Sequence, residues 1–128
     1  MMFIYSACNK NSIKHCTQHA VAACTVDSTK TNIRITNISK YDLCNVVLDP
    51  ASGPVNCGII KSGESTCYRP FDTAYSYAYI QFNIGDKEFK MQPFDYVGEV
   101  PLGVGKFTYI IDVIDYDNGK MTIGVIPD

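Results

Sequence analysis

The sequence has no tryptophan, no long apolar run and no cluster of basic residues, and each absence excludes a class of protein. No apolar run approaches the roughly 18 residues that a membrane-spanning helix requires, so membrane attachment is expected through a lipid anchor only. The 11 lysines and arginines are scattered among 13 acidic residues, which gives a net charge of −2. Nucleic-acid-binding domains usually gather Lys and Arg on one face, and we therefore expect no nucleic acid partner.

Catalytic motifs are also missing. The chain has no glycine-rich phosphate loop, no paired catalytic carboxylate motif and no Gly-x-Ser-x-Gly elbow. Both histidines, His15 and His19, stand close to Cys16 and Cys24, and imidazole and thiolate are the ligands that zinc prefers. Their order does not match a zinc knuckle, which begins with Cys-x-x-Cys. We therefore expect no metal, no cofactor and no enzyme activity. A thiol- or metal-dependent enzyme built on these four residues is the least favoured alternative.

What the sequence does contain is a succession of short alternating segments after residue 30. The alternating or β-branched segments cover residues 31–38, 43–48, 57–60, 74–84, 87–92, 106–114 and 120–126. Turn-forming residues separate them, and Asn118-Gly119 is a specific signal for a two-residue hairpin turn. Seven to eight short strands without a helical period predict an all-β domain, a β-sandwich of antiparallel strands over residues 30–128.

The first 29 residues have a different character, because a short apolar stretch is followed from residue 9 by polar sequence with no clean period. We predict that they are a signal-peptide remnant followed by a short unstructured tether. Ser6-Ala7 directly before Cys8 resembles the end of a bacterial lipoprotein signal peptide, which is cut before the cysteine that carries the lipids. This resemblance implies lipidation of Cys8 and a place in the bacterial cell envelope, either periplasmic or anchored in the outer membrane.

Further runs resemble known envelope domains. Asn37 to Val46, followed by Gly58 to Ser65, is similar to a layout of immunoglobulin-like bacterial envelope domains, in which an Ile-x-x-Gly-Glu-Ser turn joins two later strands. Tyr77 to Ile80 and Gln92 to Glu99 resemble small lipoproteins of the Bacteroidetes. The resemblance covers residues 30–114 and implies an immunoglobulin-like sandwich, without an assigned activity.

The six cysteines are many for 128 residues, and such density favours an oxidising compartment. Cys57 and Cys67 flank the turn at residues 61–63 symmetrically, so a hairpin centred there would bring them face to face. Cys44 paired with either of them is the competing arrangement. These three residues are therefore the disulfide candidates.

A stripe of tyrosines is the most suggestive functional feature. In the predicted strand 74–84, Tyr75, Tyr77 and Tyr79 share one face, and smaller or aliphatic residues occupy the other. The aliphatic face is the better core face, so the tyrosines are expected to point outward together. Exposed aromatic residues aligned in this way can contact a glycan or anchor a protein partner.

The long loop over residues 93–105 contains a second set of candidates, Asp95, Tyr96 and Glu99, because loops of this length are often functional. Together these features predict a non-enzymatic cell-envelope lipoprotein module that binds an unknown protein or glycan partner through the tyrosine-bearing strand. The alternative is a structural or assembly subunit of an envelope complex.

Overall fold

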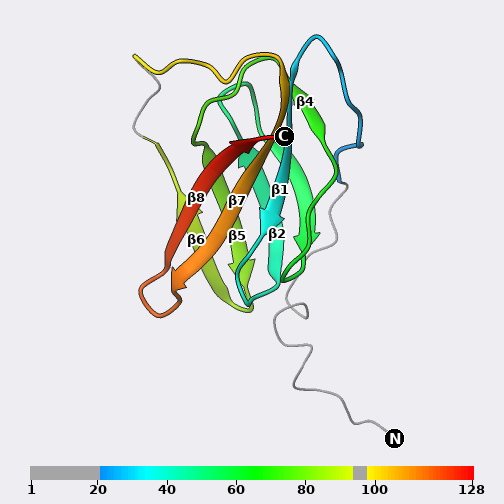
Figure 1. The fold of residues 1–128 in the computed structure, drawn as a ribbon. Coiled ribbons are helices and arrows are strands. Elements are labelled where there is room, and N and C mark those ends of the chain that lie inside the picture. The colour runs from blue at the N-terminus through cyan, green and yellow to red at the C-terminus, as the bar shows by residue number, and fades with distance from the viewer. Residues whose placement is uncertain (1–20, 94–97) are drawn as a thin grey trace, which may run out of the picture.

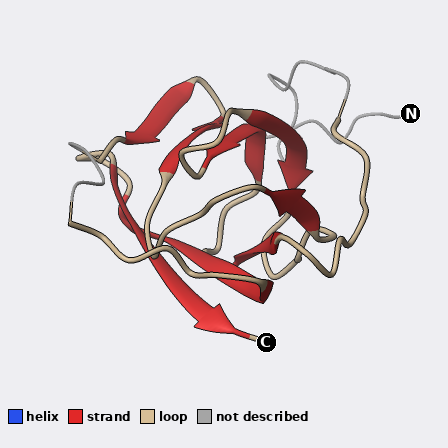
Figure 2. Ribbon diagram, turned by 90° about the horizontal axis from the view of Figure 1, so that it is seen from above, coloured by secondary structure: helices blue, strands red, loops and turns tan. Residues whose placement is uncertain are grey.

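The architecture is a sandwich of two four-stranded sheets, seen in a computed structural model that describes residues 21–93 and 98–128. These residues form eight strands and no helix (Figure 1). Seen from above in Figure 2, every regular element is a strand. The predicted all-β sandwich is therefore confirmed. No described element is a helix long and apolar enough to cross a membrane.

Neither sheet is built from a continuous stretch of the chain. The first sheet has the order β4-β1-β7-β8, with bounds Arg69–Phe71, Thr31–Asn37, Gly105–Asp115 and Lys120–Pro127. The second sheet has the order β3-β2-β5-β6, with bounds Val55–Ile60, Leu43–Asp49, Tyr79–Ile84 and Lys87–Met91. In immunoglobulin constant-type domains the first two strands share one sheet, whereas β1 and β2 lie in different sheets here. The sandwich is thus confirmed, and its immunoglobulin-like form is not.

One strand pair departs from the predicted antiparallel arrangement. β1 pairs with β7 in parallel along its whole length, from Thr31 opposite Gly105 to Asn37 opposite Ile111. All the other paired strands are antiparallel. Hairpin turns impose antiparallel pairing on neighbouring strands, but β1 and β7 are far apart in the sequence, so no local signal indicates their direction.

The core follows the period-2 alternation of the sequence. Ile33 and Ile35 of β1 are buried, and Tyr109 and Ile111 of β7 face them from the neighbouring strand. The aliphatic face predicted for residues 74–84 is likewise buried, apart from the exposed Ser76. Alternation therefore identified the core face of both sheets.

The predicted strand 74–84 is too long, because β5 begins only at Tyr79. The backbone before it bonds to other groups: the Leu102 amide donates to the Ala74 carbonyl at 2.8 Å, and the Tyr109 hydroxyl donates to the Tyr75 carbonyl at 2.5 Å. These bonds replace a strand ladder. Conversely, residues 69–71, which lie between two of the predicted strands, form β4 and pair with β1.

The described part of the predicted tether packs onto the domain. The Ala22 amide donates to the Asn56 carbonyl of β3 at 3.1 Å, and Arg69 Nε of β4 donates to the Ala22 carbonyl at 3.0 Å. Three residues later, the Thr25 amide donates to the Tyr68 carbonyl at 3.2 Å. Residues 22–25, which we call the clasp, therefore join an edge strand of each sheet.

A disulfide between Cys24 and Cys67 fixes the clasp covalently. The predicted pairing of Cys67 with Cys57 or Cys44 is therefore wrong. The chain crosses from the second sheet to the first between β3 and β4, so the turn at residues 61–63 does not place Cys57 opposite Cys67. Cys57 is a buried free thiol, and Cys44 is disulfide-bonded as well.

Candidate binding face

The outer face of the second sheet carries a row of four side chains in register, three of them polar. Val47 of β2 lies opposite Asn56 of β3 on one side and Gln81 of β5 on the other, and Gln81 lies opposite Lys90 of β6. Successive residues of a strand point to opposite faces. The neighbours of Val47 and Gln81 along their strands are core residues, so this row faces outward.

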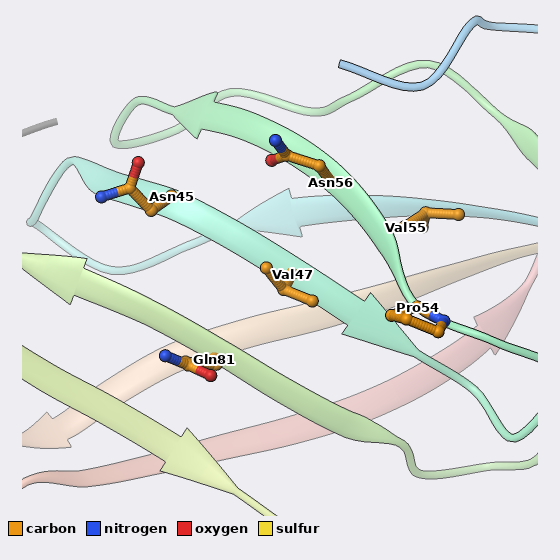
Figure 3. A pocket seen from close by; sticks show the side chains of 6 residues that line it. All are labelled: Asn45, Val47, Pro54, Val55, Asn56 and Gln81. Atoms are coloured by element: carbon orange, nitrogen blue, oxygen red, sulfur yellow. The ribbon is translucent and has the colours of Figure 1, made fainter. Parts of the chain in front are cut away.

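A shallow hollow of about 460 Å³ lies within this face (Figure 3). Its lining combines three carboxamides with three apolar side chains and comes from β3, β2, β5 and the loop before β3. The lining residues are Asn45, Val47, Pro54, Val55, Asn56 and Gln81. We call this surface the amide face.

A β-bulge in β2 borders the hollow. Cys44 pairs with Asn83 and Val47 with Gln81, so β2 contains one more residue than β5 between these two positions. Asn45 lies within the bulge with φ at 53°, in the left-handed region that Asn tolerates better than most residues. Its Nδ2 donates to Asn83 Oδ1 at 3.5 Å, which ties the bulge to β5.

Gln81 is oriented by two neighbours on its own face. Its Oε1 accepts from the Tyr79 hydroxyl at 2.6 Å, and its Nε2 donates to Glu88 Oε2 at 2.5 Å. A carboxamide has two donor hydrogens and two acceptor lone pairs. These bonds use one of each, so Gln81 retains one donor and one acceptor for a ligand.

The loop from β2 to β3 is held by Asp49 at the end of β2. Its Oδ1 accepts from the Ala51 amide at 2.9 Å and from the Gly53 amide at 3.1 Å. Ser52 Oγ donates to the Thr73 carbonyl at 2.9 Å on the neighbouring loop. These bonds fix the approach to Pro54, which lines the hollow.

The predicted tyrosine stripe does not exist as one strand face. Tyr75, Tyr77 and Tyr79 are all half-buried, and only Tyr79 belongs to β5, where it borders the amide face. Among the loop candidates, Glu99 is exposed, and Asp95 and Tyr96 lie outside the described residues.

The N-terminal candidates Cys8, His15, Cys16 and His19 also lie outside the described residues. Within residues 21–93 and 98–128, no group of three His, Cys, Asp or Glu side chains is arranged to hold a metal ion.

The amides of this face were missed in the sequence, although a signal for them exists. Asn45 interrupts the apolar run of β2, and Gln81 and Asn83 alternate with the core residues of β5. Polar residues at the outward positions of half-buried strands are ordinary, so their shared hollow appears only when the strand order is known.

Comparisons with known proteins give information about the fold alone. No family model matches the sequence, and no curated protein matches it. Among solved structures, an NMR structure of a protein from Eubacterium rectale is similar, with a TM-score of 0.55 and 13% sequence identity. The match covers 78% of this chain and 91% of that chain. At this identity the likeness supports the sandwich architecture alone.

Proposed function

We propose that this protein is a non-enzymatic binding module of the cell envelope and that its amide face binds a glycan. The observation that carries the proposal is the hollow in which the carboxamides of Asn45, Asn56 and Gln81 lie beside apolar side chains. Ligand sites commonly combine apolar lining with a few polar groups that orient the ligand.

The chemistry of the lining favours a sugar over a charged ligand. Each sugar hydroxyl both donates and accepts a hydrogen bond, and a carboxamide also does both. The apolar surface of Val47 and Pro54 can receive the C–H face of a pyranose ring. Tyr79 adds an aromatic side chain at the border of this surface. The alternative is the protein partner predicted from the sequence, which absence of glycan binding in the test below would favour.

The location in the cell envelope is also a proposal. Disulfides persist in oxidising compartments such as the bacterial periplasm, and the Cys24–Cys67 disulfide supports an envelope location. Lipidation of Cys8 would attach the domain to a membrane. Mass spectrometry of the protein made in a bacterial host tests this: we expect a diacylglycerol-modified N-terminal cysteine, and an unmodified Cys8 would contradict it.

Binding to a glycan array tests the main proposal. We expect wild type to retain neutral oligosaccharides and Gln81→Ala to weaken that binding by roughly tenfold, since one polar contact contributes about 1.4 kcal/mol. Thr122→Ala is the matched control, because Thr122 is exposed on β8 of the other sheet. Absence of glycan binding, or equal binding by Gln81→Ala, would contradict the proposal.

A second candidate is the assembly subunit, and exposed isoleucines favour it. Ile114 of β7 is 60% exposed and Ile126 of β8 is 47% exposed. β8 is an edge strand, and an edge can pair with a second chain. Light scattering decides between the two: self-association that Ile126→Lys abolishes would support assembly, and a monomer at all concentrations would exclude it.

A further inference from the structure

A second polar cluster lies on the first sheet, opposite the amide face. Arg34 of β1 donates from Nε to Thr108 Oγ1 of β7 at 2.9 Å, and Thr108 Oγ1 donates to Asp128 Oδ2 at 2.6 Å. Arg34 Nε is 3.6 Å from the same carboxylate oxygen. After β8 the Asp128 amide donates to the Lys106 carbonyl of β7 at 2.9 Å, and the Asp128 carboxylate fixes the direction of the Arg34 side chain.

Tyr68 completes the cluster with its hydroxyl and its ring. The hydroxyl donates to Asp128 Oδ2 at 2.6 Å, the Arg34 Cζ atom is 5.1 Å from the ring centroid, and Lys106 Nζ is 5.4 Å from it. The hydrogen bond to Asp128, with partial burial, raises the pKa of Tyr68, so the hydroxyl remains a donor. Two cations therefore lie against the Tyr68 ring, and one of them, Arg34, also pairs with the Asp128 carboxylate.

The guanidinium of Arg34 has unused donors beside an open space. Its Nε hydrogen bonds to Thr108, whereas its two terminal nitrogens make no hydrogen bond to the residues that the structure describes. The Arg34 side chain borders a hollow of about 410 Å³. Arg34 and Tyr68 line one part of this hollow, and Cys24 and Thr25 of the clasp line another.

We propose that this hollow binds a small carboxylate ligand at the terminal nitrogens of Arg34. A guanidinium matches a carboxylate through two parallel hydrogen bonds, and such charge-assisted pairs are stronger than neutral ones. Stacking on Tyr68 and the bond to Thr108 hold Arg34 in one orientation before the ligand arrives. Lys106 adds positive charge to the same cluster.

Asp128 acts as a positioning residue with an opposing electrostatic effect. It helps to orient Arg34, Tyr68 and Thr108, but its negative charge also lowers the attraction of this cluster for an anion. Asp128→Asn keeps an oxygen acceptor for both hydroxyls and removes the charge. This variant should therefore bind the carboxylate more tightly than wild type, the opposite of the effect expected for any substitution of Arg34.

NMR titration with sodium acetate, sodium glucuronate and sodium phosphate at constant ionic strength tests the proposal. We expect both carboxylates to give saturable shifts of the Tyr68 and Cys67 amides. Phosphate should bind more weakly, and phosphate binding above both carboxylates would overturn the assignment of the ligand. Binding of glucuronate above acetate would identify a sugar acid as the source, and equal binding would identify the carboxylate alone.

Substitutions distinguish binding at this hollow from general electrostatic attraction of anions to the protein. Arg34→Gln should weaken acetate binding roughly tenfold or more, and Arg34→Lys should also weaken it because an ammonium lacks the paired donors. Lys61→Gln removes the same charge from an exposed position outside the hollow and should have no effect. If Arg34→Gln fails to fold, Asp128→Asn decides. Weaker or unchanged binding by Asp128→Asn, or no saturable shift in wild type, would overturn the proposal.

Discussion

Asn37 at the end of β1 makes a hydrogen-bond network, and removing this network should lower the unfolding free energy by a large and measurable amount. Its Nδ2 donates to the Tyr41 carbonyl at 2.7 Å and to the Ile60 carbonyl at 3.0 Å. Its Oδ1 accepts from the Ser39 amide at 2.9 Å and from the Ser39 hydroxyl at 2.6 Å. The side chain is fully buried. It thereby joins the end of β1 in one sheet to the end of β3 in the other.

Replacing Asn37 by Ala removes all four hydrogen bonds and leaves the partner groups in the interior without them. A typical hydrogen bond contributes about 1 kcal/mol net, and a buried group left unpaired costs about 1–3 kcal/mol. Because the Ser39 hydroxyl can rotate to its remaining partner, the Tyr41 carbonyl, at 3.2 Å, we expect an unfolding free energy lower by about 2–4 kcal/mol. For a domain of this size, that corresponds to a fall in melting temperature of about 8–16 °C.

Urea unfolding followed by circular dichroism measures this change at a constant m-value. Asn118→Ala is the control, since Asn118 is exposed in the β7–β8 turn and should cost about 0.5 kcal/mol or less. A loss below about 1 kcal/mol for Asn37→Ala would refute the reasoning that these buried bonds hold the two sheets together.

Four further predictions concern the clasp disulfide, the buried thiol, the strained backbone and acid stability. Cys24→Ser with Cys67→Ser should lower the unfolding free energy in urea by about 2–4 kcal/mol, and Cys57, whose pKa is raised by burial, should resist iodoacetamide until the protein unfolds. Gly58→Ala should lower the unfolding free energy by about 1 kcal/mol or more, measured by thermal unfolding. The reason is that φ of Gly58 is +75° and the added Cβ would lie 2.9 Å from Val21 Cγ2. Partial burial opposes ionisation of Asp128, but hydroxyl donors and nearby cations outweigh it and lower its pKa. Its stabilisation is thus present above about pH 4 and lost as pH falls through the lowered pKa, so Asp128→Asn should flatten the acid limb of the stability curve.

Most of the strands could be predicted from the sequence because a half-buried strand has a period of two. The alternation of Ile33 and Ile35, or of Ile80 and Phe82, directly reflects their burial. The predicted strand before β5 was wrong because other hydrogen bonds replace the strand-to-strand bonds there. Tyr75 alternates like a strand residue, but its carbonyl bonds to a side chain from β7.

The candidate site was less predictable, because it depends on neighbours that are distant in sequence. Asn56, Val47 and Gln81 become adjacent only through the order β3-β2-β5. The bulge at Asn45 has no specific sequence signal. The pairing of Cys24 with Cys67 likewise depends on the docking of the clasp, which spacing along the chain does not indicate.

The most direct measurement of the central proposal is an amide NMR titration with neutral disaccharides, namely cellobiose, N,N′-diacetylchitobiose, maltose and mannobiose. The proposal predicts saturable shifts that concentrate at Val47, Asn56 and Gln81 and spare β8 of the opposite sheet. Shifts concentrated on the first sheet, or no saturable shift with any of the four sugars, would contradict a glycan-binding role for the amide face.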